Sequence, residues 1–394
     1  MKCKLLAATV LAATTILVGC TMCKTAIPNN NSDTNSNALI RAGLKDKCGY
    51  IDETGHWVIN PQFDEVKDFA ENGLAPVKLN GKWGYIDKNG KWIINPQFND
   101  ANDFGGNGLA RVKLHGKLDF LNDKWGFIDK TGNWVIDPQF DDAENFENGL
   151  ARVKLHGKCG FIDETGNWVI NPQFDRAGDF CENGLAYAKL NDKFGFIDKT
   201  GNWVINLQFN DAGYFVENGL ARAKLNGKWG YIDKTGKFVI NPQFDGAYDF
   251  AENGLALVKL NGKYGYIDKT GNWVINPQFD WALDFAENGL ALVNLSYKYY
   301  KYGFIDETGK WVINPQFDWA TDYAENGLTV VVLNDKYGCI DETGKWIINP
   351  QYDYMLIYEN TIFIKKKRKW GILDKNGNIA AKPQFDWVVD NIYR

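Results

Sequence analysis

Ten aspartates recur at the same point of an Asp-x-x-Gly segment, and carboxylates repeated in this way could bind calcium. They are Asp52, Asp87, Asp129, Asp163, Asp198, Asp233, Asp268, Asp306, Asp341 and Asp374. Calcium needs several oxygen ligands from one compact loop, and no segment here has the alternating acids of such a site. An aspartate that opens such a turn can cap its own backbone instead. We therefore predict turn capping and no metal site.

Catalytic side chains are scarce. His56, His115 and His156 are the only histidines, and they fall at two different positions of the repeat described below. His115 and His156 replace the Asn of an Asn-Gly turn, so we expect them to be exposed. No serine-nucleophile motif, phosphate-binding loop or Cys/His cluster accompanies them. The sequence predicts no catalytic residue, no enzyme activity and no cofactor.

Cys20 is the residue with the clearest expected chemistry. Lys2 and Lys4 precede an apolar run, Leu5 to Val18, which is too short to span a membrane comfortably. The run ends in Leu17-Val18-Gly19-Cys20, which resembles the lipobox of bacterial lipoproteins. That resemblance implies a signal peptide over residues 1–19 and lipidation of Cys20 after cleavage. The alternative is an ordinary signal peptide with an incidental cysteine.

Lipidation at Cys20 would place the protein in the bacterial cell envelope. Several acyl chains together give stable anchoring to a membrane. Thr21, rather than Asp, follows the cysteine, and by analogy with one group of bacteria this favours the outer membrane, on its periplasmic or its surface face. Residues 20–38 are polar and of low complexity, so we interpret them as a disordered tether.

Four further cysteines occupy positions where small apolar groups belong. They are Cys48, Cys159, Cys181 and Cys339. Buried thiols are the preferred interpretation, although their spacing leaves disulfide pairing open in an exported protein.

One variable position changes character along the chain: the residue after a Phe-Asp pair or its equivalent. In six copies it is mostly polar: Glu65, Asp100, Asp142, Arg176, Asp211 and Gly246. In the last four it is aromatic: Trp281, Trp319, Tyr354 and Trp387. Aromatic faces suit sugar rings or apolar protein segments, so these four are candidate ligand-binding residues. The alternative is that their rings fill gaps between neighbouring segments.

Apart from those in residues 1–38, these residues belong to one repeated unit, marked by an aromatic residue or Cys followed by Gly. The pair begins at Cys48, Trp83, Trp125, Cys159, Phe194, Trp229, Tyr264, Tyr302, Tyr337 and Trp370, with steps of 33 to 42 residues. This unit resembles the WG (or KWG) repeat found in many bacterial surface and secreted proteins. The resemblance implies an all-β repeat domain that binds or scaffolds, in a family without an established activity.

One copy of the unit predicts three strands. Leu74 to Leu79 and Lys82 to Asp87 alternate around Asn80-Gly81, a strong hairpin signal that sets Val77 opposite Gly84. A third strand after the Asp-x-x-Gly turn should end at Pro96, which has no N–H to continue a ladder. Both faces of this meander are apolar, so we expect neighbouring units to cover both.

Residues 39–394 are therefore predicted to be a tandem array of about ten three-stranded antiparallel meanders. An open superhelical stack is the preferred arrangement, because propellers usually have 4–8 four-stranded blades. A closed propeller-like ring is the alternative. Insertions at 118–124 and 296–301 are expected to protrude.

Charge argues against a nucleic-acid partner. The net charge of −5 becomes −7 without residues 1–19, and acids and bases are interspersed. The one basic run, 365–369, is interpreted as a solvated turn, with an anionic membrane or glycan contact as the alternative. We predict a binding or scaffolding protein, held to a membrane through Cys20, with an envelope glycan or protein as ligand. The alternative is a purely structural spacer.

Overall fold

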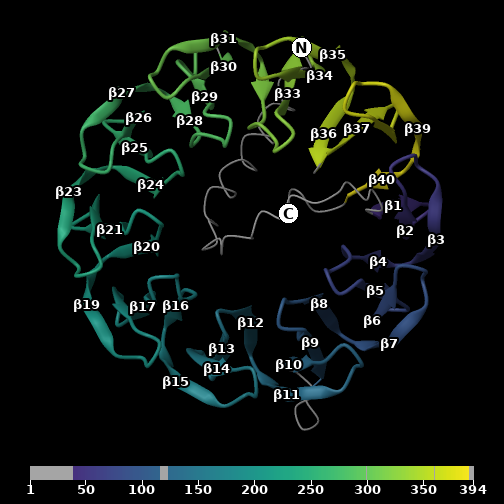
Figure 1. The fold of residues 1–394 in the computed structure, drawn as a ribbon, viewed down its shortest axis with the longest axis horizontal. Coiled ribbons are helices and arrows are strands. Elements are labelled where there is room, and N and C mark those ends of the chain that lie inside the picture. The colour runs from purple at the N-terminus through teal and green to yellow at the C-terminus, as the bar shows by residue number, and fades with distance from the viewer. Residues whose placement is uncertain (1–38, 116–122, 299, 359, 390–394) are drawn as a thin grey trace, which may run out of the picture.

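The computed structural model describes residues 39–115, 123–298, 300–358 and 360–389. Every regular element in these ranges is a strand, and the strands form ten four-stranded antiparallel sheets arranged around a central axis (Figure 1). Among the described residues, no helix is long and apolar enough to cross a bilayer. Cys20, the signal and tether ranges and most of the 118–124 insertion lie outside the described residues.

Each sheet runs from an innermost strand near the axis to an outermost strand, and we number the blades from the one that holds β1. Blades 1 to 3 are β40 (Trp387–Val388), β1 (Ile40–Leu44), β2 (Lys47–Ile51), β3 (Trp57–Phe63); β4 (Glu65–Val66), β5 (Leu74–Leu79), β6 (Lys82–Asp87), β7 (Trp92–Phe98); and β8 (Asp100–Phe104), β9 (Ala110–His115), β10 (Asp123–Ile128), β11 (Trp134–Phe140). Blades 4 to 6 are β12 (Asp142–Glu147), β13 (Leu150–Leu155), β14 (Lys158–Asp163), β15 (Trp168–Phe174); β16 (Arg176–Ala177), β17 (Ala186–Leu190), β18 (Lys193–Ile197), β19 (Trp203–Phe209); and β20 (Asp211–Phe215), β21 (Ala221–Leu225), β22 (Lys228–Ile232), β23 (Phe238–Phe244).

The remaining blades follow the same order. Blades 7 and 8 are β24 (Gly246–Phe250), β25 (Ala256–Leu260), β26 (Lys263–Ile267), β27 (Trp273–Phe279); and β28 (Trp281–Ala282), β29 (Ala291–Asn294), β30 (Tyr302–Ile305), β31 (Trp311–Phe317). Blades 9 and 10 are β32 (Trp319–Ala320), β33 (Leu328–Leu333), β34 (Lys336–Asp341), β35 (Trp346–Tyr352); and β36 (Tyr354–Tyr358), β37 (Thr361–Lys366), β38 (Lys369–Leu373), β39 (Ile379–Phe385).

The turns of blade 2 form as the sequence predicts. Asn80 and Gly81 both have positive φ, 51° and 77°, and Val77 pairs with Gly84. At the next turn an Asp87 carboxylate oxygen accepts hydrogen bonds from two backbone N–H groups, those of Asn89 and Lys91, each at 2.9 Å. The prediction that the repeated aspartates cap their own turns is therefore confirmed.

The predicted three-stranded unit is wrong by one strand. The segment that returns to the axis contributes a short innermost strand, as where Glu65 pairs with Lys78 and Val66 with Val77. In β4 only two residues form this strand, and one of them is charged. An element this short lacks the alternation by which a strand is recognised in a sequence.

The outermost strand also continues through its proline, contrary to our prediction. β7 includes Pro96, because its outer edge is unpaired and a bulge separates the Trp83–Phe98 and Tyr85–Ile94 pairs. At this bulge the outer strand approaches the Gly of the WG pair closely. A Cβ at Gly84 would lie 2.5 Å from the Ile94 carbonyl oxygen, so a side chain there would displace the backbone of the outermost strand.

The predicted open stack is wrong, and the array closes as a ring (Figure 1). The first copy begins at β1, a second strand without an innermost partner, while the last copy ends in an extra innermost strand, β40. β40 completes the first blade: Val388 pairs with Ala42, and the Val389 N–H donates to the Arg41 carbonyl at 3.0 Å. Closure thereby pairs the edge that an open stack would leave bare.

The core lies between adjacent blades, not within one blade. The apolar face of blade 2 with Tyr85 and Ile94 packs on Ala110 and Val112 of blade 3, all buried. Its opposite face, with Ala75, packs on blade 1. Both faces are covered by neighbours, as predicted.

Removing the closing strand tests this architecture. A chain truncated after Phe385 loses β40 and three apolar residues, Trp387, Val388 and Val389, of which the two valines are buried. Each buried side chain of this size contributes roughly 1.5–3 kcal/mol, so we expect Tm to fall by about 10 °C in differential scanning calorimetry. The matched control, truncation after Val389, should leave Tm unchanged. Equal Tm values for the two truncations would contradict closure through β40.

Candidate functional site

The four predicted aromatic residues lie at one position in four consecutive blades. Trp281, Trp319, Tyr354 and Trp387 are the first residues of the innermost strands β28, β32, β36 and β40. Ring closure makes Trp387 a member of blade 1, next to blade 10. All four side chains are half-buried.

Ring contacts join some of these residues through the aromatic residue of the WG pair. The centroid distances are 5.5 Å for Trp281–Tyr302, 6.3 Å for Trp319–Tyr337, 4.8 Å for Tyr337–Tyr354 and 5.6 Å for Tyr354–Trp370. Tyr337 thus links Trp319 and Tyr354 across two blades. Trp387 covers the backbone of Gly43, where a Cβ would lie 1.8 Å from the indole Nε1.

The residue of the second strand that pairs with the first residue of the innermost strand differs between the blades with an aromatic residue there and the other blades. In the six other blades it is always lysine: Lys78, Lys113, Lys154, Lys189, Lys224 and Lys259. Opposite the aromatic residues it is Asn294, Val332, Lys365 and Gly43. Three of the four aromatic residues thus face a shorter side chain than lysine. This exchange becomes visible in the sequence once the pairing register is known.

A second region, which sequence reasoning missed, is built from the loops that join innermost to second strands. In blade 2 the loop turns tightly: Gly73 has φ 79°, and the Asn72 side chain accepts a hydrogen bond from the Leu74 N–H at 3.0 Å. The repeated Glu-Asn-Gly sequence is therefore a turn signal, and it carries an acid at its tip. These loops share one end of the ring with the Asp-x-x-Gly turns; we call it the inner-loop end, and the opposite end the hairpin end.

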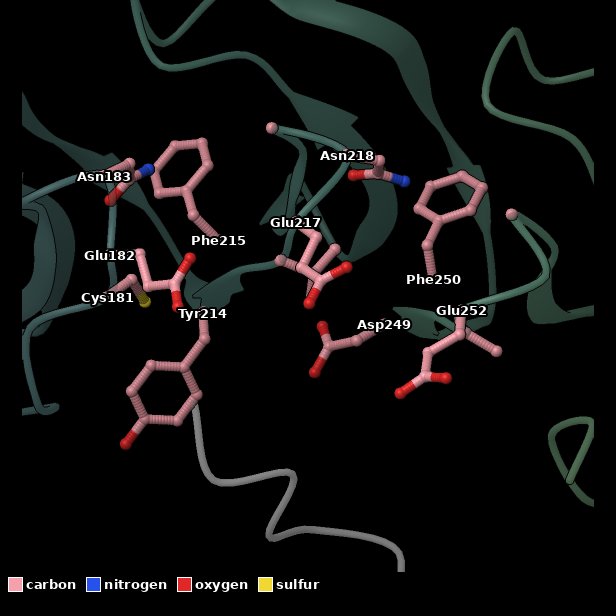
Figure 2. Close-up of a pocket in the computed structure, with 14 residues that line it drawn as sticks. Cys181, Glu182, Asn183, Tyr214, Phe215, Glu217, Asn218, Asp249, Phe250 and Glu252 are labelled. Carbon is pink, nitrogen blue, oxygen red and sulfur yellow. The ribbon is translucent and has the colours of Figure 1, made fainter. Parts of the chain in front are cut away.

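Consecutive inner loops enclose two adjoining cavities. One, of about 690 Å³, is lined by the loops of blades 5, 6 and 7. Figure 2 shows Glu182, Glu217 and Glu252 coming from these three loops, with Tyr214 of β20 and Asp249 of β24 beside them. The second, of about 460 Å³, extends over blades 7, 8 and 9 and shares Asp249 to Glu252 with the first. We call the two cavities together the inner-loop groove.

Arginine neutralises the acids of the inner wall over part of the ring. At four blade junctions an arginine on a second strand pairs with an acid on the next blade. The pairs are Arg41–Asp68 at 2.7 Å, Arg111–Glu144 at 2.8 Å, Arg152–Asp179 at 3.7 Å and Arg222–Asp249 at 3.1 Å. At one further junction Tyr187 faces Tyr214, with centroids 5.0 Å apart.

Blades 8 and 9 keep the acid without the arginine. Leu257 and Leu292 stand at the arginine position of the second strand, while Asp284 and Asp322 stay on the inner wall. Burial, reinforced by the charges of Asp249 and Asp322, raises the pKa of Asp284 to about 7. Burial alone raises the pKa of Asp322 to about 6. This part of the groove therefore holds carboxylates whose ionised form is costly.

The other predicted residues have plain structural roles. His56, His115 and His156 are exposed. Cys48, Cys159, Cys181 and Cys339 are buried, as expected for small apolar positions. In the described part of the chain, no three His, Cys, Asp or Glu residues form a group that could hold a metal ion.

Two exposed segments noted in the sequence lie at the hairpin end. Within the 296–301 insertion, Tyr297 and Tyr300 are about half exposed, at 47% and 50%. In the basic run, Lys367 and Arg368 form the turn with positive φ, and Lys365 lies over the Trp370 ring. The run is a solvated hairpin turn.

These features define the class: the chain is a ten-bladed β-propeller whose ring is closed by its last strand. The family model of the WG containing repeat matches residues 49–83, 83–117, 125–159, 160–194, 194–229, 229–264, 264–299, 302–337, 337–370 and 370–392, so the chain belongs to the WG-repeat family. A comparison with curated proteins finds no match.

Two solved structures are similar to this chain at low sequence identity. A eukaryotic initiation factor is 10% identical, with a TM-score of 0.55 over 90% of this chain and 97% of its own. Hsv2p of Kluyveromyces lactis is 9% identical, with a TM-score of 0.37 over 63% of this chain and 97% of its own. At such identities, the likeness to the initiation factor shows the fold alone.

The pKa of Asp284 predicts a pH-dependent gain in stability for Asp284→Asn. An unfolded aspartate has a pKa of about 4, so the wild type loses free energy of unfolding through this group as pH rises from about 4 to the folded pKa of about 7. The variant should be more stable by about 3 kcal/mol at pH 8, and this difference should shrink towards zero at pH 4 in urea unfolding.

Asp68→Asn is the matched control, since it occupies the same position but pairs with Arg41 at 2.7 Å. It should destabilise the protein at pH 8, because the arginine loses its partner. An equal response of the two variants would refute the assignment of an uncompensated charge to blade 8.

Substitution of Trp281→Ala together with Trp319→Ala tests the role of the aromatic positions. Both rings are half-buried against apolar neighbours, so we expect Tm to fall by several degrees. Asp211→Ala with Gly246→Ala changes the same position in two other blades and should have a smaller effect. An unchanged Tm for the tryptophan variant would show that the two indole side chains do not stabilise the propeller. They would then be available to contact a ligand.

Proposed function

We propose that this propeller is a lipid-anchored binding or scaffolding protein of the bacterial cell envelope, and that it binds its ligand in the inner-loop groove. The observation that carries the proposal is the groove itself. It is assembled from the same Glu-Asn-Gly segment of five consecutive blades, 5 to 9, and the wall residue beside it changes from Tyr214 in blade 6 to Asp249, Asp284 and Asp322 in blades 7 to 9. A pure spacer needs no such concave, charged surface.

The constant and the variable parts of the unit support this division of roles. The Asp-x-x-Gly turns and the aromatic contacts between blades recur around the ring and hold it together. The inner wall instead alternates between arginine, tyrosine and leucine from blade to blade, as at Arg222, Tyr187 and Leu257. These residues decide whether the acids of the concave wall beside them are paired, and extended concave surfaces are what repeat proteins use for binding.

The aromatic row at the hairpin end is a second candidate contact region. The rings of Trp281, Trp319, Tyr354 and Trp387 are only half-buried, so part of each remains open to a sugar ring or an apolar segment. An envelope glycan or protein is the ligand class we propose for this protein.

Attachment to the membrane is proposed through lipid on Cys20, with the outer membrane favoured. Cys20→Ala should move the protein from the membrane fraction to the soluble fraction, because one or no acyl chain gives at best reversible binding. Membrane partition is measured by ultracentrifugation and detergent-phase separation of cells that produce each form. The control is Cys23→Ala, which changes the neighbouring cysteine and should stay in the membrane fraction. Unchanged partition of the Cys20 variant would refute lipid anchoring.

Binding in the groove is tested by charge reversal. Glu217→Arg with Glu252→Arg changes two exposed acids of the groove and should abolish retention of components from envelope extracts and glycan arrays by immobilised protein. The matched control, Asp46→Arg with Asp335→Arg, makes the same charge change in exposed turns at the hairpin end, where Arg368 already occupies the equivalent position. Equal retention by both variants would place binding outside the groove.

A further inference from the structure

The charged side chains that line the part of the groove between blades 7 and 9 are all acids. Eight carboxylates line this cavity of about 460 Å³, and none of its lining residues is Lys, Arg or His. The eight are Asp249, Glu252, Asp284, Glu287, Glu307, Asp322, Glu325 and Glu342. Like charges held this close repel one another, and a bound cation would relieve the repulsion.

Buried polar atoms in this cavity lack partners. The Asp284 Oδ1 is enclosed and accepts no hydrogen bond from the described residues, and the amide Nδ2 of Asn288 donates none. Asp249, whose side chain is only 8% exposed, is the exception, because Arg222 forms an ion pair with its Oδ1 at 3.1 Å. An enclosed carboxylate oxygen without a donor costs free energy, and a ligand N–H group would satisfy it.

The arrangement does not suit one metal ion. No three of these acids, nor any other three metal-ligating side chains in the described part of the chain, form a group that could hold one. The acids instead come from three inner loops and from two Asp-x-x-Gly turns, those of Glu307 and Glu342. The negative charge is therefore spread along the groove, and it matches a cation whose charges are likewise spread.

Apolar groups separate the acids. Phe285 and Ala286 lie between Asp284 and Glu287 in blade 8, and Tyr323 and Ala324 take the same places in blade 9. Aliphatic methylene groups pack on such surfaces while the ammonium groups they connect stay at polar sites. A chain of methylenes with ammonium groups at intervals therefore matches the lining in both respects.

Building on the proposed binding function, we propose that the groove between blades 7 and 9 binds a linear aliphatic polyamine. Its ammonium groups donate to Asp284, Asp322 and the glutamates of the loop tips, and its methylenes pack between Phe285 and Tyr323. At three other junctions Arg41, Arg111 and Arg152 already pair with acids of the wall, which leaves fewer carboxylates there open to the ligand.

Isothermal titration of the purified protein with spermine at low ionic strength tests this inference. We expect saturable binding that weakens as salt is added, because the contacts are between charges. Asp284→Asn with Asp322→Asn should lower the affinity at least tenfold. Both changes remove buried charge without changing size, so the variant should fold; its melting curve is recorded to establish this.

Asp46→Asn with Asp335→Asn is the matched control, because it removes two exposed acids at the hairpin end and should leave spermine affinity unchanged. A tetralysine peptide is titrated in parallel. Displacement of spermine by this peptide at equal concentration would support the binding of spaced ammonium groups in the groove. It would identify a lysine-rich segment as the source of those groups. Tighter binding of Ca²⁺ than of spermine would overturn the proposal.

The remaining outcomes separate this inference from the proposed function. Wild-type affinity for spermine in the Asp284/Asp322 variant, or no binding to the wild type, overturns the polyamine site. If the wild type still retains an envelope component through the groove, the binding function stands without it. If the wild type binds neither, both proposals fall.

Discussion

The ring depends on one contact between blades: the edge of an aromatic ring on an outermost strand against a phenylalanine of the preceding blade. Nine such contacts have centroid distances of 5.5 to 6.2 Å and nearly perpendicular rings. The pair Trp57–Phe385, at 5.6 Å and 82°, joins the first blade to the last and is geometrically like the others. Edge-to-face packing has a preferred direction, so each contact sets the angle between two blades as well as holding them together.

The turn glycines depend on the same contact surface. At Gly90 an added Cβ would meet Ile59 of the preceding blade at 3.3 Å, and at the closure Gly55 would meet Ala381 at 2.4 Å. The Asp-x-x-Gly turn thus does two things: its aspartate fixes the backbone, and its glycine lets the turn approach the neighbouring blade. This explains why the turn varies so little although it lies at the surface.

The inner wall carries a different constraint. A strand near the axis places its side chains close to those of the next blade, so a charge there needs a partner or a ligand. At four junctions an arginine forms an ion pair with the acid of the next blade. At another junction two tyrosines, Tyr187 and Tyr214, pack against each other instead. In blades 8 and 9, Asp284 and Asp322 have no arginine beside them, and the groove there combines high negative charge with enclosed, unpartnered atoms. The scaffold tolerates this cost because the contacts between outermost strands are far from the axis.

The sequence by itself determined the repeat, its turns and its pairing within a hairpin, because these depend on residues close together in the chain. Asn80-Gly81 sets the register of Val77 and Gly84 without help from other blades. Ring closure and the fourth strand depend on residues far apart: Trp387 reaches Gly43 only when ten blades have turned through a full circle. The groove also depends on residues far apart in the chain. Asp284 and Asp322 stand out only when the structure shows that Leu257 and Leu292, and not arginines, lie at the neighbouring positions of the second strands. The turns are determined by short segments of sequence, because their hydrogen bonds join residues close together in the chain. Closure and the charge of the inner wall depend on the summed angles of ten packed interfaces, which only the tertiary structure decides.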